Sequence, residues 1–482
     1  MLRTRSGRAE PRPHRSLWLE QALADEREHL ATPPLSGRRR ADICIVGGGY
    51  AGLWTAVRLK EADPSLDVTL LEADICGGGS SGRNAGFALS WWVKAQALLD
   101  LCGTDDGVWL CRQSQDAVEE IGQFASTHGL DIGFAKQGWL WGASSEAQIG
   151  ASDDAVALAQ AVGADVYQRL DPGEVRERAG SAAFKAGVLA RDAATLHPAR
   201  LARGLRTVAL GMGVTIYEGS PVKRLATGIR PAAVTERGRV EAERIVIALG
   251  PWSARLQELR ALERAMVIVS SDEIATEPIP HLLAEHGPKG QWGISDSRLM
   301  VRNARTHEGR FFFGIAGHHL AYGTRVGRSF EYGARRTKVI ERTFRQLYPT
   351  LAQARITHAW GGPVDRTEAG VPIFGRLPDA PDVIYCAGFS GNGVGPAVLA
   401  GHVLTSLALD RDDRWASTGL IREPRRAFPP EPARSTGGIV VRRAVRACED
   451  AADNGKTAPL PVRALAALAP AGLVRSSGEV GR

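Results

Sequence analysis

The chain has 482 residues, 44% of them hydrophobic and 23% charged, a composition typical of globular proteins and long enough for two or more domains. Its net charge of +7 lies at the two ends, because residues 41–410 carry a net charge of −2. A near-neutral body lacks the basic face of a nucleic-acid-binding protein, and no apolar run reaches the ~20 residues of a membrane span. We therefore expect no nucleic-acid partner and no membrane contact.

Residues 1–40 form an N-terminal extension that begins rich in Arg and Pro. A short helix is expected to begin at Ser16 and run to about His29, before Pro33 and Pro34 end it.

A glycine turn follows in residues 43–52, which read Ile-Cys-Ile-Val-Gly-Gly-Gly-Tyr-Ala-Gly and predict a strand that enters a helix. Gly47 permits the tight turn, Gly49 lets the backbone approach a pyrophosphate, and Gly52 lets the helix lie against the strand. Glu72 ends the next apolar run, twenty residues after Gly52, and can accept hydrogen bonds from a ribose 2′-OH. The combination predicts an adenine-dinucleotide site, with an ordinary glycine-rich turn as the alternative.

The middle of the chain mixes helices and strands. Helices are expected over 95–130 with Gly129 as the C-cap, over 151–162, and from Pro198 to Gly211. Strands are expected over 138–142, 187–189, 214–217 and 244–249. Between 265 and 332 the pattern changes to strands with little helix, at 266–270, 298–302 and 310–315, which indicates a second domain with its own sheet.

A second glycine-rich turn, residues 388–395, follows the last buried strand at 383–387 and precedes a helix over 396–409. Two such turns suit a flavin dinucleotide better than a nicotinamide one, because the second helix can direct N–H groups at the flavin ring, where negative charge develops on reduction. An NAD-dependent dehydrogenase would share the first motif without needing the second turn. A non-catalytic FAD-binding protein is a third possibility.

The order of these elements predicts an α/β fold: a Rossmann-like FAD-binding domain with a second, discontinuous α+β substrate domain built on a largely antiparallel sheet. The FAD-binding domain is expected in 41–90, 185–260 and 355–410, and the substrate domain in 91–184 and 261–354. Residues 411–482 are expected to form an extended arm and a helix. That helix is interpreted as packing on its own domain or on a subunit partner in a homo-oligomer, in preference to a membrane surface.

Five motifs occur together in the order of a known family: 45–52, 80–86, 194–198, 247–252 and 388–395. On these motifs the chain resembles the D-amino-acid oxidase (DAO) family of FAD-dependent oxidoreductases, and within it the gamma-glutamylputrescine oxidase branch. The resemblance implies oxidation of the C–N bond of an amine or amino acid, with hydride transfer to flavin N5 and hydrolysis of the resulting imine. The electron acceptor would be oxygen or an electron-transfer partner.

The resemblance also implies the residues that contact FAD. Beside Gly47, Gly49, Gly52 and Glu72, they come from the 80–86 motif, from the region after the strand at 214–217, from the 247–252 motif and from the second glycine turn. They are Ser81, Arg83, Asn84, Val222, Gly250, Trp252, Gly391, Asn392, Gly393 and Val394.

Substrate residues are expected near 298–322. By the resemblance, Arg305 lies nearest the place of an Arg that binds a substrate carboxylate, with Arg302 in contention. A planar guanidinium is a bidentate carboxylate donor, although a solvent-facing strand Arg is an equal alternative. His318, His319 and Tyr322 follow the same strand and are candidates to face the flavin, against the more common structural role of a lone His.

The nucleophiles of relatives that bind FAD covalently are missing, because Arg83 stands where one kind has His and Gly362 stands near the place of a Cys. FAD is therefore expected to be non-covalent. No Lys occurs between Lys289 and Lys338, which puts efficient use of oxygen in doubt. The six cysteines form no CxxC pair, so we interpret them as reduced thiols of a cytoplasmic protein without a metal site.

Overall fold

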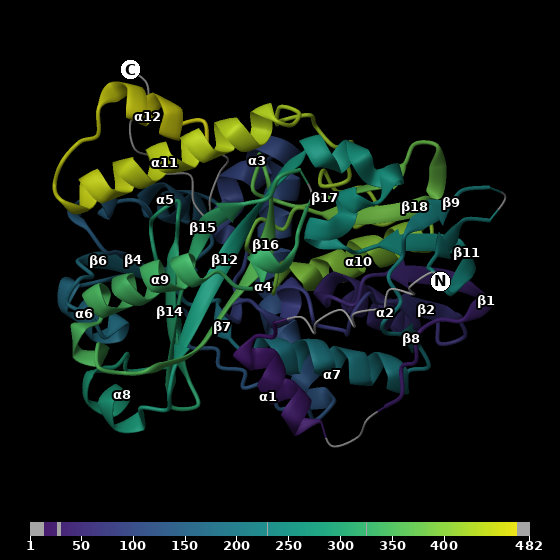
Figure 1. Ribbon diagram of the computed structural model, residues 1–482, viewed down its shortest axis with the longest axis horizontal. Coiled ribbons are helices and arrows are strands. Elements are labelled where there is room, and N and C mark those ends of the chain that lie inside the picture. The colour runs from purple at the N-terminus through teal and green to yellow at the C-terminus, as the bar shows by residue number, and fades with distance from the viewer. Residues whose placement is uncertain (1–13, 27–29, 229, 324, 470–482) are drawn as a thin grey trace, which may run out of the picture.

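Two eight-stranded sheets form the frame of the molecule in the computed structural model, which describes residues 14–26, 30–228, 230–323 and 325–469 (Figure 1). One sheet is mainly parallel and is covered by helices, and the other is mainly antiparallel. The predicted α/β class with a second, largely antiparallel sheet is confirmed.

The first sheet has the strand order β17-β18-β11-β1-β2-β8, with β10 paired to β11 and β9 paired to β10. Its central strand β1 pairs in parallel with both β11 and β2. The strands are β1 (Gly37–Val46), β2 (Val68–Leu71), β8 (Thr215–Tyr217), β9 (Arg224–Ala226), β10 (Ala232–Val234), β11 (Gly238–Ile247), β17 (Ile373–Leu377) and β18 (Ala380–Ala387).

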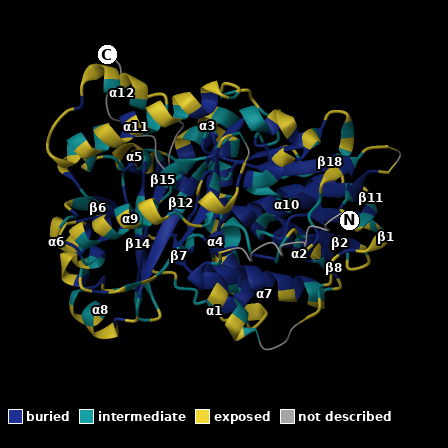
Figure 2. Ribbon diagram, in the orientation of Figure 1, coloured by how far each residue is buried: buried dark blue, intermediate teal, exposed yellow. Residues whose placement is uncertain are grey.

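Both faces of β1 are buried, which is why its apolar run 43–46 is continuous rather than alternating. Ile43 and Ile45 point into one core, where α2 (Tyr50–Ala62), α7 (Pro198–Gly211) and α10 (Pro396–Ala408) cover the sheet. Cys44 and Val46 point into a second core on the opposite face. Figure 2 shows α7 and α10 as largely buried, in contrast to the exposed outer sides of the C-terminal helices.

The second sheet has the order β16-β12-β15-β14-β13-β4-β6-β5, and every pairing in this order is antiparallel except that of β13 with β4. One face packs on a core that includes α9 (Ala334–Leu347), and the other face turns toward the first sheet. The strands are β4 (Trp139–Ala143), β5 (Tyr167–Leu170), β6 (Ala186–Ala190), β12 (Met266–Thr276), β13 (Gly293–Asp296), β14 (Arg302–His307), β15 (Arg310–Leu320) and β16 (Ile356–Thr367).

Three details differ from the sequence predictions. The expected strand 298–302 is wrong: these residues form most of the turn between β13 and β14, held by Asp296, whose Oδ1 accepts the amide N–H of Arg302 at 2.9 Å. The expected helix 95–130 is two helices, because Gly103 adopts a φ of +80° between them. β6 pairs with β4 and β16 pairs with β12, so both strands belong to the second sheet, although both fall in segments predicted for the FAD-binding domain. The domain boundaries stay a prediction.

The remaining elements surround the two sheets. The short strands β3 (Phe87–Ala88) and β7 (Ala194–Thr195) pair with each other. The other helices are α1 (Leu17–Asp25), α3 (Ala95–Cys102), α4 (Thr104–Thr127), α5 (Asp153–Ala161), α6 (Pro172–Ala179), α8 (Pro280–His286), α11 (Ala433–Asp453) and α12 (Leu460–Ala466).

Both chain extensions pack on the body. The short helix expected from Ser16 is α1, which ends at Asp25 rather than near His29, and Ser16 caps it by accepting the amide N–H of Leu19. Residues 1–13 and 27–29 lie outside the described part of the chain. The C-terminal α11 lies against β15 (Figure 1), where Arg442 donates a hydrogen bond to the carbonyl of His318. Of the described helices, none combines the length and the apolarity that crossing a membrane requires.

Candidate functional site

A cavity of about 1030 Å³ lies between the first sheet and the face of the second sheet that turns toward it. At one end it is lined by the glycine turn after β1, by Glu72 and by Val222. At the other end its wall is the second sheet, with residues of β12, β13, β14, β15 and β16. The carboxyl ends of parallel strands are where α/β sheets place their ligand sites, and this cavity begins there.

The backbone of the first glycine turn has the shape that its sequence predicts. Gly47 has a φ of +116°, and a Cβ there would lie 2.4 Å from the carbonyl oxygen of Ala248. A Cβ on Gly52 would lie 2.0 Å from the carbonyl oxygen of Gly47, so α2 can pack this closely only with glycine. Gly47 and Gly49 line the cavity, whereas Gly52 lies behind them as a packing residue.

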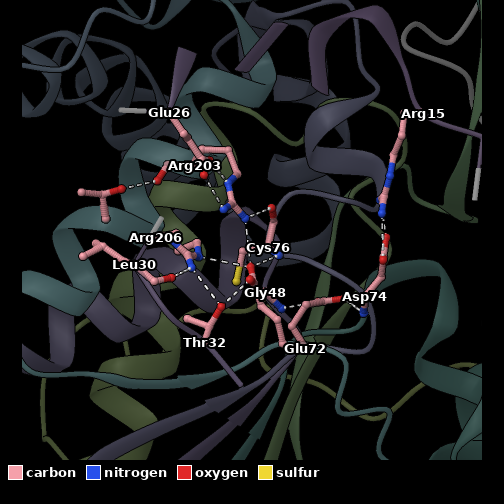
Figure 3. A network of polar contacts seen from close by, with 12 residues as sticks. Arg15, Glu26, Leu30, Thr32, Gly48, Glu72, Asp74, Cys76, Arg203 and Arg206 are labelled. Carbon is pink, nitrogen blue, oxygen red and sulfur yellow. Dashed lines mark hydrogen bonds and ion pairs between the residues drawn. The ribbon is translucent and has the colours of Figure 1, made fainter. Parts of the chain in front are cut away.

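Glu72 lines the cavity and also holds the turn in place (Figure 3). Its carboxylate accepts the amide N–H of Gly48 at 2.8 Å and that of Asp74 at 2.9 Å. Burial raises the pKa of Glu72, and these two hydrogen bonds oppose the rise. A carboxylate has about four acceptor positions, so Glu72 can still accept from a ribose hydroxyl.

Behind Glu72 a polar network fixes the following loop (Figure 3). Glu218 accepts the amide N–H of Cys76 at 2.7 Å and is paired with Arg203 at 2.9 Å and Arg206 at 3.2 Å. Arg203 also pairs with Glu26 from the N-terminal extension. Burial acts to raise the pKa of Glu218, but hydrogen bonds from Thr32 and from the Cys76 amide, together with the two arginines, keep it below its usual value. The network therefore remains charged at neutral pH.

The 80–86 motif forms the next part of the cavity wall, and Ser81, Arg83 and Asn84 all line it. Ser81 Oγ accepts the amide N–H of Tyr50 at 2.9 Å, which satisfies a free donor at the start of α2. The Arg83 guanidinium donates to the carbonyls of His14, Gly78 and Gly361. The sequence therefore predicted that this loop lines the cavity. The structure adds that its polar side chains also form hydrogen bonds to backbone groups and so hold the backbone in place.

The second glycine turn reaches the cavity through Gly391, Gly393 and Val394. Ser390 and Gly391 adopt positive φ angles of 57° and 88°. Asp365 of β16 anchors the turn by accepting the amide N–H of Gly388 at 2.6 Å. Asn392 does not line the cavity: its Nδ2 donates to the carbonyl of Ser90 at 3.1 Å, which joins the turn to the chain after β3.

Gly250 and Trp252, which were predicted from the 247–252 motif, also line the cavity. Gly250 has a φ of +49°, and a Cβ there would lie 3.7 Å from Asp365 Oδ2. The two glycine turns and this motif therefore meet around one space.

The predicted substrate residues lie elsewhere. Arg305 is 1% exposed and donates to the carbonyls of Ala85, Gly86 and Leu196, so its guanidinium ties β14 to the 80–86 region. It is not part of the cavity lining. Arg302 points away from the cavity toward Asp453 of α11, at 3.6 Å.

His318, His319 and Tyr322 are likewise outside the cavity lining. Burial and nearby arginines lower the pKa of His318 to about 4, and its backbone carbonyl serves Arg442. His319 Nε2 lies 3.2 Å from Ser329 Oγ, and Tyr322 is 52% exposed. His318 and His319 lie on β15 beyond Gly317, which has a φ of +88°, and Tyr322 follows the end of that strand.

Sequence reasoning missed the polar wall of the second sheet. Strand pairing places Glu273, Gly314, Asn303 and Ser295 in one row across β12, β15, β14 and β13. Directly opposed residues share a face, and Glu273, Asn303 and Ser295 line the cavity. The alternation of residues along β12 could have revealed this wall, because Ser271 and Glu273 share the face that turns to the first sheet.

Glu273 is buried, and its Oε2 has no hydrogen-bond partner among the described residues. Burial raises the pKa of Glu273 to about 8. A Cβ on Gly314 would lie 2.8 Å from Glu273 Cγ, so this glycine makes the room that the carboxyl occupies. The carboxyl is therefore a protonated group on the cavity wall at neutral pH.

The cavity fits an extended adenine dinucleotide and offers no covalent link to it. At its first end, the glycine turn can donate backbone N–H groups to a pyrophosphate, and the Glu72 carboxylate can accept hydrogen bonds from a ribose. An adenine dinucleotide needs both kinds of group. Gly362 lies directly against Arg83, since a Cβ on Gly362 would be 3.3 Å from Arg83 Cβ. Cys386 lines the cavity, and burial raises the pKa of its thiol, which disfavours the nucleophilic thiolate.

Comparison with known proteins agrees with this geometry. Residues 42–407 match the family model described as FAD dependent oxidoreductase (DAO). The chain is 30% identical over 415 residues to "Probable oxidoreductase OrdL" of Rhizobium meliloti (strain 1021), covering 86% of this chain and 92% of that protein. It is 26% identical to "Gamma-glutamylputrescine oxidoreductase" of Escherichia coli (strain K12), covering 80% and 88% of the two chains.

The fold is similar to that of a solved structure. The crystal structure of glycine oxidase from Geobacillus kaustophilus matches with a TM-score of 0.63 and 22% sequence identity, over 78% of this chain and 96% of that chain.

Proposed function

This chain belongs to the DAO family of FAD-dependent oxidoreductases, which act on amines and amino acids. We propose that the cavity of about 1030 Å³ between its two sheets holds both FAD and the substrate. The observation that carries the proposal is the continuity of the cavity. It runs from Gly47, Gly49 and Glu72 at the first sheet to Glu273 and Asn303 on the second sheet. One end has the chemistry of a dinucleotide site, and the other has a wall of side chains.

Non-covalent FAD held in this cavity would supply the acceptor for a hydride from the carbon that bears the amine, and water would hydrolyse the resulting imine. The residues of the chain bind and orient. The free N–H groups at the start of α2 would hold the pyrophosphate, and Glu72 would accept a hydrogen bond from the ribose. Gly391, Gly393 and Val394 present the second turn to the flavin ring.

The substrate is proposed to lie between the flavin and the second sheet, against Ser271, Asn303 and Ala316. Ser295 Oγ donates to Asn303 Oδ1 at 2.8 Å, which orients the Asn303 amide so that its N–H groups are free to face the cavity. The apolar side chains Phe87 and Leu89 close the wall from the side of β3 and keep water from the reacting carbon.

We place the enzyme in the reducing cytoplasm, which is supported by six free cysteines. The electron acceptor is proposed to be either oxygen or an electron-transfer partner. The two differ in how fast the reduced enzyme is reoxidised by air.

The test is anaerobic reduction of the purified yellow holoenzyme by a panel of amines, N-methyl amino acids, D- and L-amino acids and aminophosphonates. Bleaching of the flavin absorbance by at least one of them is the expected result. Protein that takes up no FAD, or whose flavin no compound in the panel bleaches, would contradict the proposal. Admission of air, and separately of an artificial electron acceptor, then shows which acceptor restores the yellow colour.

A further inference from the structure

Glu273 differs from the other carboxyl groups of the cavity wall in what it contacts. Those other groups accept hydrogen bonds from backbone N–H groups or from an arginine, and they are Glu72, Asp74, Glu331 and Asp365. The Oε2 atom of Glu273 is buried without a hydrogen-bond partner among the described residues. The cation that acts on Glu273 is Arg305, whose Nη1 already donates to three backbone carbonyls. A buried acceptor of this kind is costly unless a ligand satisfies it.

The Glu273 carboxyl lies over β15. A Cβ on Gly314 would be 2.8 Å from Glu273 Cγ and 3.7 Å from its Cδ, so the carboxyl occupies the space above this glycine. On the other side of Gly314 lies Asn303 of β14. Trp139 Nε1 donates to Ser295 Oγ at 2.9 Å, and Ser295 Oγ donates to Asn303 Oδ1 at 2.8 Å, which fixes the Asn303 amide. The carboxyl therefore lies on the part of the wall against which the substrate is proposed to bind.

This part of the wall offers no other side chain that takes up a proton near neutral pH. Of the described residues that line the cavity, none is a histidine. The lysine in the lining, Lys223, pairs with Glu236 at 2.9 Å and lies beside Val222 at the first-sheet end. Glu273 is thus the proton acceptor nearest to hand for a group bound at the second sheet.

Oxidation of an amine needs such an acceptor. An alkyl amine has a pKa of about 10 and is an ammonium ion at neutral pH. A hydride can leave the neighbouring carbon only when the lone pair of the nitrogen is free to form the C=N bond. The substrate therefore loses a proton first, either to water before it binds or to a group of the site.

We propose that Glu273 accepts this proton from the ammonium group of the substrate and so presents a neutral amine for oxidation. The inference rests on the proposed function, since it places the amine in the same cavity. An N–H bond of the ammonium breaks and an O–H bond forms at Oε2, while the electron pair stays on the nitrogen. That pair forms the C=N bond as the hydride leaves the carbon for FAD. Glu273 returns its proton to solvent after the product has left.

The surroundings of Glu273 suit this exchange. Burial raises the pKa of Glu273 to about 8, Asp272 acts in the same direction, and Arg305 acts against them. The residues paired with Glu273 on β15 and β16, Gly314 and Trp360, carry no charge. A base is most effective when its pKa lies near the working pH, and an ammonium bound beside the carboxyl favours its ionised form.

The experiment compares wild type, Glu273→Gln and a control, Glu277→Gln, each loaded with FAD. Glutamine keeps the size of the side chain and removes the proton acceptor. Glu277 is not part of the cavity lining and pairs with Arg355 at 3.1 Å. FAD content and melting temperature are recorded for each protein. The second-order rate constant of anaerobic flavin reduction by an amine is then measured from about pH 6 to about pH 11.

We expect the wild-type constant to rise about tenfold per pH unit below the Glu273 pKa of about 8, and to stay level until the amine itself loses its proton near pH 10. Glu273→Gln should use only amine that is already neutral in solution, so its constant should keep rising to about pH 10. At pH 7 the variant should be slower on the order of 100-fold, and near pH 10 the two should agree within about threefold. Glu277→Gln should follow wild type.

A second readout needs no turnover. tert-Butylamine has no hydrogen on the carbon that bears the amine, so it can bind without being oxidised. In calorimetric titrations its affinity for wild type should level off above about pH 8, and its affinity for Glu273→Gln should rise further to about pH 10. A merely structural role of Glu273 would not produce this difference in pH dependence. If Glu273→Gln does not fold, the wild-type profiles decide alone.

Two results would overturn the inference. One is a wild-type profile that rises without a break through pH 8 to the pKa of the amine. The other is the same profile in wild type and Glu273→Gln. If no amine or amino acid reduces the flavin of wild type, the proposed function fails. Binding of tert-butylamine then still decides whether Glu273 accepts a proton from an ammonium group, and absence of that binding overturns the inference as well.

Discussion

The two ends of the cavity differ in whether backbone or side chains form most of the wall. At the first sheet the wall is backbone, shaped by Gly47, Gly49 and Gly52 and steadied by Glu72. At the second sheet the wall is side chain, with Glu273, Asn303 and Arg366 contributed by three different strands. The first end suits a ligand that carries phosphate, because phosphate recognition by backbone N–H groups depends on chain geometry. The second end can change its ligand by exchanging single residues without changing the fold.

The largest expected effect comes from a side chain placed in the backbone end. Gly49→Val should yield folded protein that retains no FAD, because Gly49 lines the cavity at the start of α2 and a branched side chain blocks the approach of the pyrophosphate. A Cβ there meets only Ser81 Oγ, at 3.0 Å, so the fold should tolerate the change. The measurement is the flavin-to-protein absorbance ratio after gel filtration.

Gly211→Ala is the matched control for that loss, since a Cβ at Gly211 of α7 meets no atom within 4 Å. It should keep full FAD content. Retention of FAD by Gly49→Val would mean that the pyrophosphate does not lie on this turn.

The second effect compares two arginines that face the same side of the second sheet. Arg305→Gln should lower the free energy of unfolding by about 3 kcal/mol or more, because three buried carbonyls lose a charged donor. Arg366→Gln should change it by less than about 1 kcal/mol, because no described group loses a partner. Urea denaturation of both variants at one fixed excess of FAD measures the difference. Equal destabilisation would mean that Arg366 is also structural.

These two arginines show what the sequence could and could not reveal. The glycine turns and Glu72 were predictable, because their spacing along one stretch of chain encodes their geometry. Arg305 was predicted as a substrate ligand from its place near the strand 310–315. Its hydrogen-bond partners Ala85 and Leu196 come from distant parts of the chain, so no local sequence pattern could predict them. Arg366 was overlooked for the same reason: its face and its lack of partners depend on how β16 pairs with β12.

Asn392 and Glu273 show in opposite ways that belonging to a motif does not decide whether a residue lines the cavity. Asn392 belongs to a predicted motif, yet it is used to hold the carbonyl of Ser90. Glu273 belongs to no motif, yet the room left by Gly314 on the neighbouring strand admits it to the cavity wall. Motif position therefore predicts the backbone end of the cavity well and the side-chain end poorly.

The third effect tests the protonated carboxyl of Glu273. Burial raises its pKa to about 8 from an ordinary value of 4.5. Between these two values the unfolded chain has lost the proton and the folded protein has kept it, so stability should fall as pH rises from about 5 to 8, by at most ~1.4 kcal/mol per pH unit. Glu273→Gln should make this fall shallower, although burial also raises the pKa of Asp365, to about 6, and that group still contributes. The melting temperature of the variant relative to wild type should therefore rise toward pH 8.

The control for Glu273 is Glu277→Gln, just beyond the end of β12. Glu277 pairs with Arg355 at 3.1 Å, which keeps its pKa below the usual value, so its substitution should not flatten the curve between pH 5 and 8. Parallel curves for wild type and Glu273→Gln would show that Glu273 does not stay protonated on the wall.

The smallest expected effect concerns the Ser81 side chain, which contributes to the backbone end of the cavity. Ser81→Ala removes the acceptor of the Tyr50 amide N–H at the start of α2 and should cost about 1 kcal/mol of unfolding free energy, as the loss of a helix cap does. Ser65→Ala, at an exposed turn where Ser65 Oγ donates to Asp63, should cost less than about 0.5 kcal/mol. If Ser81 only steadies the turn, FAD affinity should fall in proportion to this stability loss. A fall in FAD affinity much larger than tenfold would mean that Ser81 Oγ itself binds the cofactor, and that the backbone end of the cavity also depends on a side chain.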